Sequence, residues 1–242
     1  MTDIFQQIGL QGIVKPYDKR IPKKELFLHG KLSKPERDLI TDRVEEVRLM
    51  YVLNKFTFPM ESVINETERF DCIFFVQVSL RKELVTQKMN RLLQEMIPSP
   101  LIIVYLLDNK LLFSSAKKRL NRNEQGKIVV EECHQSEWIY ADACDDFLEK
   151  ISLKNIPTLD YKQVYTAIHE NIYKQANSDI VKQVEGSNFY QLKEQTEQYK
   201  LMENEVLYLT KKINLKSTSL KEKIELAKNI EEIKKKQQNI IS

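Results

Sequence analysis

The chain has 242 residues, of which 30% are charged, and a formal net charge of only +3. This length allows one large domain or one domain with an extension, and the near-neutral balance excludes a strong polyelectrolyte. The chain has only five glycines, too few to suggest the glycine-rich phosphate-binding turns of doubly wound nucleotide enzymes. The cysteines, Cys72, Cys133 and Cys144, are odd in number and far apart, and no apolar run approaches the roughly 18 residues of a membrane span. We therefore expect a cytoplasmic protein.

A basic segment follows a short apolar stretch near the N-terminus. Pro16 and Pro22 fix their own φ angles and disfavour helix in the residues before them, so we expect an extended arm here. Such an arm can lie along nucleic acid or pack on its own domain. The cations assigned to nucleic-acid binding in this arm are Lys19, Arg20, Lys23 and Lys24.

A helix is predicted to begin after the arm. Ser33 and Glu36 form a capping-box pair, with Pro35 in the first turn. The apolar positions that follow repeat at intervals of four, three and four residues, which is the spacing of one helix face. These positions are Ile40, Val44, Val47 and Tyr51. The helix is therefore predicted to end near Met50–Tyr51.

The most apolar part of the chain lies between Cys72 and Leu107. Residues 72–80 and 101–107 are rich in β-branched and aromatic side chains and are predicted to form buried strands. Between them, apolar residues repeat at helical spacing, at Val85, Met89, Leu92, Leu93 and Met96. Two strands that are joined by a helix are normally parallel. The fold class predicted is therefore α/β, with a mixed sheet around a central βαβ unit.

Further strands and a second basic segment come next. Asp108–Asn109 predicts a turn into a strand at 111–115, and short strands at 127–131 and 137–140 are predicted to extend the sheet antiparallel. Four cations fall within six residues at the end of the first of these strands. They could bind phosphates or keep a surface loop soluble. These cations are Lys117, Lys118, Arg119 and Arg122.

Helical sequence predominates after residue 142. An amphipathic helix is predicted from Tyr161 to Ile172, and Gly186 marks a plausible boundary. The domains expected are an α/β domain with a basic arm at 1–150, a helical extension at 151–186 and a C-terminal helical segment at 187–242.

The C-terminal segment has a heptad pattern. Apolar residues recur every seven residues from Leu192 to Ile213, and the pattern breaks at 216–219. The two helices on either side of the break can fold back as a hairpin or form a coiled coil with a partner or a second copy of the chain. The residues assigned to partner binding are Tyr199, Met202, Val206, Leu209 and Ile213.

Motifs of the common enzyme classes are missing from the sequence. It contains no Walker, Rossmann, zinc-protease, nucleophile-elbow or CxxC motif. His29, His134 and His169 are scattered, and the adjacent Cys133 and His134 would point to opposite faces of a strand. We therefore predict no catalytic residues, no metal ligands and no cofactor.

A metal-dependent nuclease is the enzymatic alternative. Residues 68–107 have the strand, helix and strand order of restriction-endonuclease-like cores. Where a metal-binding glutamate is expected, the strand has Gln77 and Ser79, neither of which supplies an anionic oxygen. Carboxylates that could serve instead lie just upstream, at Glu66, Glu68 and Asp71. A degenerate, inactive core of this kind is favoured over an active one.

Several landmarks of the sequence resemble those of the bacterial domain of unknown function 4391 family. They are the arm Lys19–Lys24, the helix ending near Met50–Tyr51, the strand Phe74–Leu80 with Arg81–Lys82, the turn Ile97–Ile103, the pair Glu137–Trp138 and the lysine-rich tail. The resemblance implies a companion of DNA methyltransferases and superfamily 2 helicases in restriction-like anti-phage operons. It implies no catalytic role. Relatives tend to carry acidic residues where this chain has Gln77 and Ser79.

Three functions follow from these observations. The first is a non-catalytic accessory subunit of a bacterial anti-phage DNA-defence complex, which docks on a helicase, nuclease or methyltransferase and can contact DNA. The second is a metal-dependent nuclease with a divergent site. The third is a sequence-independent nucleic-acid-binding module. Self-association through the C-terminal helices is a further option, and no membrane partner is expected.

Overall fold

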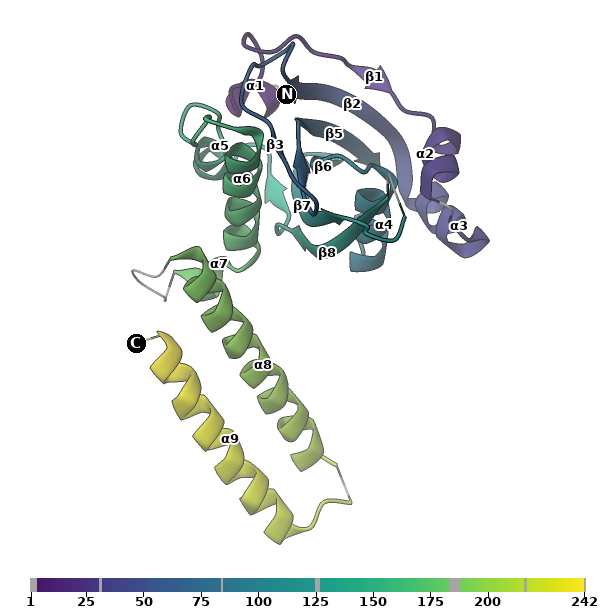
Figure 1. Cartoon of the computed structure of the whole chain (residues 1–242). Helices are drawn as coiled ribbons and strands as arrows, with labels where there is room; N and C mark the ends of the chain where they lie inside the picture. The colour runs from purple at the N-terminus through teal and green to yellow at the C-terminus, as the bar shows by residue number, and fades with distance from the viewer. Residues whose placement is uncertain are drawn as a thin grey trace. The chain divides into compact units, whose positions relative to one another are not determined.

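The computed structural model describes residues 4–30, 32–83, 85–124, 127–182, 188–215 and 217–241. Contacts within the chain divide it into two units, Met1–Ala176 and Asn177–Ser242. The first unit is built on a sheet, and the second consists of helices (Figure 1).

The main sheet has the strand order β1-β2-β5-β6-β7-β8, and β9 also pairs with β7. The strands are β1 (Lys19–Arg20), β2 (Val44–Asn54), β5 (Cys72–Leu80), β6 (Leu101–Leu107), β7 (Lys110–Leu120), β8 (Ile128–Gln135) and β9 (Ile139–Tyr140). Strands β5 and β6 are parallel and are joined by α4 (Gln87–Met96), whereas the other neighbours are antiparallel. The predicted βαβ unit and mixed sheet are confirmed. A separate small hairpin pairs β3 (Val63–Ile64) with β4 (Arg69–Phe70).

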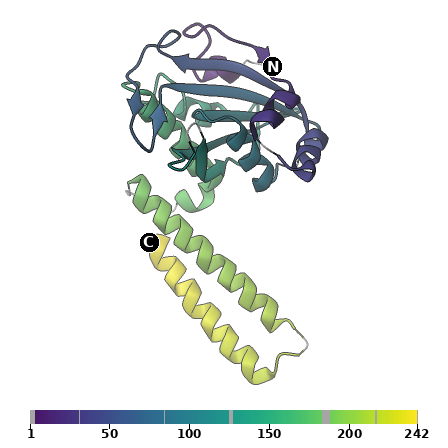
Figure 2. The ribbon, with the colours of Figure 1, turned by 45° about the vertical axis from the view of Figure 1, so that its right-hand side comes forward.

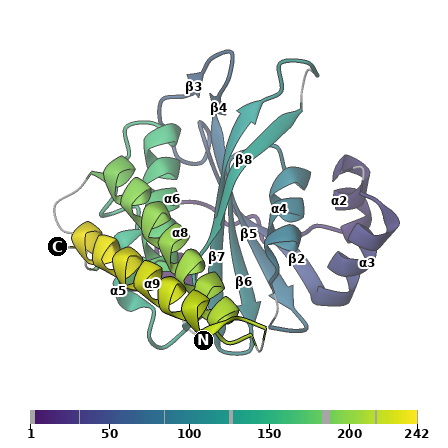
Figure 3. The same cartoon turned by 90° about the horizontal axis from the view of Figure 1, so that it is seen from below.

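Helices cover both faces of this sheet (Figure 3). One face packs against α1 (Ile4–Gln7), α5 (Asp145–Lys150) and α6 (Tyr161–Ala176), and the other against α2 (Lys23–Gly30), α3 (Lys34–Arg43) and α4. Successive residues of β5 alternate between the two cores, with Phe75 in the first and Val76 in the second. Because both faces are buried, the central strands need no polar alternation, which explains their continuous apolar sequence.

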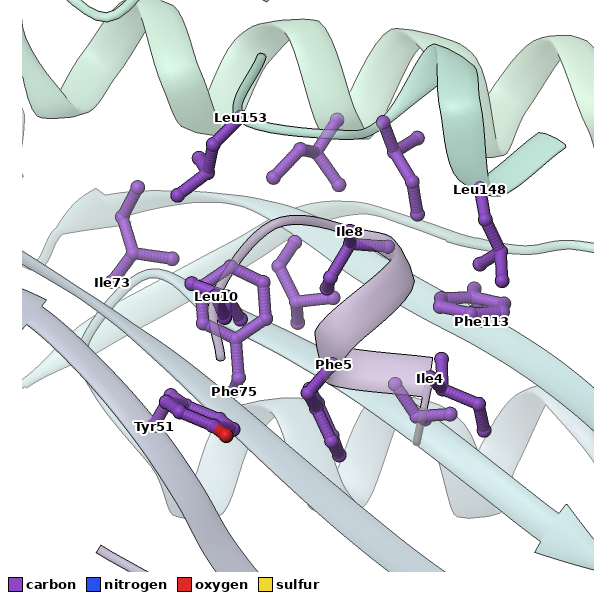
Figure 4. Packing of buried hydrophobic residues seen from close by; sticks show 14 of the residues in the cluster. Ile4, Phe5, Ile8, Leu10, Tyr51, Ile73, Phe75, Phe113, Leu148 and Leu153 are labelled. Atoms are coloured by element: carbon purple, nitrogen blue, oxygen red, sulfur yellow. The ribbon is translucent and has the colours of Figure 1, made fainter. Parts of the chain in front are cut away.

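The N-terminal residues complete the first core (Figure 4). The ring of Phe5 lies 5.3 Å from the ring of Tyr51 on β2, centroid to centroid. Ile8 and Leu10 are 2% and 0% exposed. The segment before the basic arm is therefore part of the folded unit.

A chain of buried polar side chains connects α4 to the sheet. Tyr105 Oη donates to Asn90 Oδ1 at 2.8 Å, and Asn90 Nδ2 donates to Cys133 Sγ at 3.2 Å. Gln94 Nε2 donates to Ser114 Oγ at 3.2 Å. The predicted apolar face of α4 is confirmed, and these additional bonds satisfy polar groups that would otherwise be costly to bury.

The predicted helix after the arm ends earlier than the sequence pattern indicated. It begins at the expected capping box, where Glu36 Oε2 accepts from Ser33 N at 3.0 Å, but α3 ends at Arg43 and β2 follows at once. The prediction that it reaches Tyr51 is wrong. β2 has register irregularities between Val44 and Glu46 and between Leu49 and Tyr51. An extra residue in a strand lengthens the spacing of buried side chains from two to three, which imitates helical spacing.

Both basic segments lie mostly in regular structure. The arm is extended at β1, where Lys19 lies opposite Leu49 of β2, but Lys23 begins α2. Lys117, Lys118 and Arg119 lie within β7, so the prediction that they follow the end of the strand is wrong. The pairing of β7 with β8 continues through these residues, which explains the longer strand.

The second unit contains α7 (Ser178–Val181) and two long helices, α8 (Phe189–Ile213) and α9 (Leu220–Ile241). α9 runs back alongside α8 (Figure 2), and the chain breaks between them where the sequence predicted. Ser219 Oγ accepts from Glu222 N at 3.3 Å, as expected for the second capping box. The boundary expected at Gly186 lies outside the described residues. Among those described, no helix has both the length and the apolar character needed to cross a membrane.

The docking of α6 can be tested at Tyr165. Its Oη accepts from Ala116 N at 3.0 Å and donates to Ala116 O at 2.8 Å, and burial raises the pKa of the phenol above its ordinary value, so the donor stays protonated. Replacing Tyr165 by Phe leaves the buried Ala116 N–H without its partner. We expect the free energy of unfolding to fall by about 1–3 kcal/mol in chemical denaturation. Tyr17→Phe, at a half-exposed ring, is the control and should change it little. Equal stabilities of the two variants would contradict this account of α6 docking.

Candidate functional site

The two predicted nucleic-acid-binding segments lie on different parts of the sheet. β1 is the first strand in the order and β7 is the fifth, with β2, β5 and β6 between them. Neighbouring strands are about 4.8 Å apart, so the two segments are separated by about 19 Å across the sheet. The structure therefore presents two separate basic surfaces.

The cations of the first segment have different environments. Lys19 and Lys24 are exposed, whereas Arg20 Nε lies 3.3 Å from Glu46 Oε1. Lys23 Nζ donates to Val44 O, and burial, followed by repulsion from Arg81 and Arg20, lowers the pKa of Lys23. Lys19 and Lys24 are therefore the cations of this segment that are best placed to meet a phosphate.

The cations of the second segment divide between the two faces of β7. Lys117 Nζ and Arg119 Nε lie 3.7 Å and 3.0 Å from the Glu131 carboxylate on β8. Lys118 points inward instead, and its Nζ donates to Ile97 O at 2.7 Å and to Ser99 O at 2.9 Å. Lys118 thus secures the turn between α4 and β6.

Arg122 completes the second segment. It lies in the loop after β7 and is exposed. Its guanidinium can therefore approach a ligand without first giving up a buried position.

A cavity of about 320 Å³ lies beside Lys118. Its polar lining includes Arg69, Asp71, Cys72, Ser99 and Arg119. Desolvation raises the pKa of the Cys72 thiol, so the nucleophilic thiolate is disfavoured. Desolvation also opposes ionisation of Asp71, but hydrogen bonds and charge from Arg69 outweigh it and lower the pKa of that carboxyl. The cavity can therefore offer hydrogen bonds and positive charge to a small anion, without an activated nucleophile among these groups.

The carboxylates considered for a nuclease are mostly engaged with cations. Asp71 Oδ2 lies 2.7 Å from Arg69 Nη2, and Glu68 Oε2 accepts from Lys162 Nζ at 2.6 Å. Within the described ranges, no group of three potential metal ligands converges on Gln77. Gln77 itself is paired in register with Arg48 and Val104. This arrangement gives a hydrolytic metal little to bind on the central strand.

Two histidines that the sequence shows as scattered come together in the fold. The ring centroids of His134 on β8 and His169 on α6 are 5.0 Å apart, and Glu132 lies beside them. Sequence reasoning missed this group because it joins a strand to a distant helix. A partial signal was present, since Glu132 and His134 are two residues apart and so share one strand face.

The residues predicted to bind a partner lie on α8. All five are partly buried, and α9 packs along α8 with Leu226 and Ile233 buried. They are Tyr199, Met202, Val206, Leu209 and Ile213. This seam is therefore used, at least in part, for contacts between α8 and α9.

A second apolar line runs along α8. Tyr190, Leu201 and Tyr208 are 82%, 70% and 66% exposed. Their spacings of eleven and seven residues bring them to nearly the same angle around the helix, opposite the seam. We call these three residues the outer stripe.

The chain matches the model of one protein family over most of its length. The family model described as "Domain of unknown function (DUF4391)" matches residues 16–237, and the chain belongs to this family. The resemblance inferred from the sequence landmarks is confirmed. No curated protein and no solved structure matches the chain. The family description assigns no activity.

The environment of Lys118 predicts a pH dependence of stability. Burial lowers the pKa of Lys118 from 10.5 to about 7. Between these values the unfolded chain binds more protons than the folded one, so this group makes the free energy of unfolding rise with pH. The stabilising contribution of Lys118 is fully present above pH 10.5, which is its pKa in the unfolded chain. It is lost as the pH falls through about 7, which is its pKa in the folded chain. We expect urea denaturation to show this rise in the wild type but not in Lys118→Met.

Lys117→Met is the matched control for this measurement, because Lys117 is exposed on the same strand. It should keep the pH dependence of the wild type. The interpretation is wrong if the Lys118→Met and wild-type profiles have the same slope.

Proposed function

We propose that this chain is a non-catalytic accessory subunit of a bacterial anti-phage DNA-defence complex. It docks through the outer stripe of α8 on a DNA-processing partner, namely a helicase, nuclease or methyltransferase. The observation that carries the proposal is the stripe itself, three large exposed apolar side chains on the side of α8 away from α9. Aligned aromatic and aliphatic side chains are what a helix presents to a protein partner, and tyrosine is enriched in such interfaces.

Charges beside the stripe favour a protein as the occupant. By helical position, Glu194, Glu205 and Lys212 lie along one flank, and Glu197, Lys200 and Lys211 lie along the other. Both flanks therefore carry charges of both signs, which suit a partner helix with a complementary pattern. A nucleic acid would meet the carboxylates on both flanks unfavourably, because its phosphates are uniformly negative.

The sheet unit supports a non-catalytic role. We infer a degenerate restriction-endonuclease-like core from the order β5–α4–β6. In this core Gln77 on β5 stands in place of a metal-binding carboxylate. Asp71 and Glu68 are held in ion pairs, which lowers their availability to an ion. A core that keeps such a scaffold without its metal ligands serves binding better than hydrolysis.

In the proposed complex, DNA contacts come from the exposed cations. Lys19, Lys24 and Arg122 are exposed members of the predicted set, and they supply sequence-independent affinity. Three free cysteines suit a reducing compartment, so we place the complex in the cytoplasm.

The docking proposal is tested by co-purification with the proteins encoded beside this chain's gene. The tagged wild type should capture one helicase, nuclease or methyltransferase subunit. A variant with Tyr190→Ser, Leu201→Ser and Tyr208→Ser should bind it at least about tenfold more weakly, since buried aromatic anchors dominate interface energies. Dissociation constants are measured by calorimetry.

Leu207→Ser is the matched control, because Leu207 is an exposed apolar residue of α8 off the stripe. It should bind as the wild type does. Unchanged affinity of the triple variant, or no capture of any such protein by the wild type, contradicts the proposal. Cleavage of DNA with Mg²⁺ or Mn²⁺ that disappears in Asp71→Ala would favour the nuclease alternative instead.

A further inference from the structure

We propose that Glu132, His134 and His169 form a binding site for a divalent transition-metal ion, with Zn²⁺ as the ion of choice. The site does not depend on the docking role, and it departs from the expectation, based on the sequence, of no metal ligands. Among the described residues, the ligand atoms of these three side chains lie close enough together to share one ion.

Strand geometry brings two of the ligands together. Glu132 and His134 lie two residues apart on β8 and therefore project from the same face of the sheet. Glu132 Oε2 lies 3.4 Å from His134 Nε2. Ligands bound at roughly 2.1 Å in a tetrahedron are about 3.4 Å apart, so this pair already has the separation that an ion requires.

The third ligand comes from the helix that packs over this face. His169 of α6 is 8% exposed, and one ligand atom of each of the three residues lies within 4.8 Å of the others. Since ion-bound ligands are about 3.4 Å apart, the gap that remains on His169 is at most about 1.4 Å, which small adjustments of the three side chains can close. The ion would thus join α6 to β8.

Ser115 supports His169 in the way expected of a metal ligand. Ser115 Oγ lies 2.8 Å from His169 Nδ1, and Ser115 is the Cα partner of His134 across β7 and β8. In the proposed site His169 donates Nδ1–H to this hydroxyl and binds the ion through Nε2. Histidine ligands usually hold their second nitrogen in such a hydrogen bond, which fixes both the tautomer and the ring orientation.

A tyrosine ring packs against each of the two histidines. Tyr173 meets the His134 ring edge-on at 4.9 Å, and Tyr165 stacks on His169 at 6.2 Å, centroid to centroid. These rings limit the rotation of the imidazoles and exclude water from one side of the group. A constrained, partly dry environment raises the affinity of neutral imidazole for a metal relative to bulk solvent.

The ligand set selects the class of ion. Two imidazole nitrogens and one carboxylate are typical of Zn²⁺ and other first-row transition metals, whereas Mg²⁺ and Ca²⁺ prefer oxygen ligands. Three protein ligands leave a fourth position for water or a group from a bound molecule. The chain's own contribution is to hold these three donors on two elements that pack together.

The test is a Zn²⁺ titration of the full chain, purified without a polyhistidine tag and stripped with chelator, in competition with a chromophoric chelator. We expect one Zn²⁺ per chain and no comparable binding of Mg²⁺. Free Zn²⁺ at about 100 times the dissociation constant should raise the melting temperature by roughly 5–10 °C. His169→Ala and Glu132→Gln should each weaken binding at least about tenfold and abolish most of the thermal shift.

Glu131→Gln is the matched control, because Glu131 is next to Glu132 on β8 but its carboxylate pairs with Lys117 and Arg119. His29→Ala controls for the remaining histidine of the chain. Both should keep wild-type affinity. Glu132→Gln keeps the shape of the side chain and remains informative if His169→Ala does not fold. The proposal is overturned if the wild type binds no Zn²⁺, if Glu132→Gln binds it unchanged, or if Glu131→Gln loses it equally.

Discussion

The parallel pairing of β5 with β6, covered by helices on both faces, is the constraint on which the first unit depends. Val76 and Ile103 lie opposite each other in this pair and are 1% exposed. A sheet buried on both faces leaves no room for solvated side chains at its centre, and any polar group there needs a partner inside the protein. Asn90, Tyr105 and Cys133 meet this requirement through one another. The groups able to act on a ligand therefore lie toward the ends of the strands and at the sheet's later strands.

The same packing that closes the first core also assembles the histidine group. α6 binds the backbone of β7 through Tyr165, and one turn later it places His169 on Ser115. The proposed metal site is thus a consequence of how α6 docks, and an ion bound there would strengthen that docking. This coupling explains why residues with no shared motif can form a site: their positions are fixed by the core beneath them.

Much of the sheet unit could be predicted from the sequence, because the strongest signals were local. The apolar runs at β5 and β6 and the repeating face of α4 depend on residues near one another in the chain. The β2 strand could not be recognised from Val44 and Val47, since its irregular register gave them a helical spacing. The inward position of Lys118 was missed for another reason. The strand was predicted to end at residue 115, so the alternation of faces was not extended to Lys118, which lies within β7.

The C-terminal helices show how one sequence pattern is compatible with two contact surfaces. The heptad positions of α8 were predicted to pack in a hairpin or to meet a partner, and they are partly buried with α9 alongside. A helix that is apolar on one side only needs no further neighbour, but α8 is apolar on two opposite sides. The side bearing Tyr190, Leu201 and Tyr208 exposes large side chains whose hydration is unfavourable. Because α9 packs against the seam, the outer stripe is the apolar side of α8 that stays accessible to a protein partner.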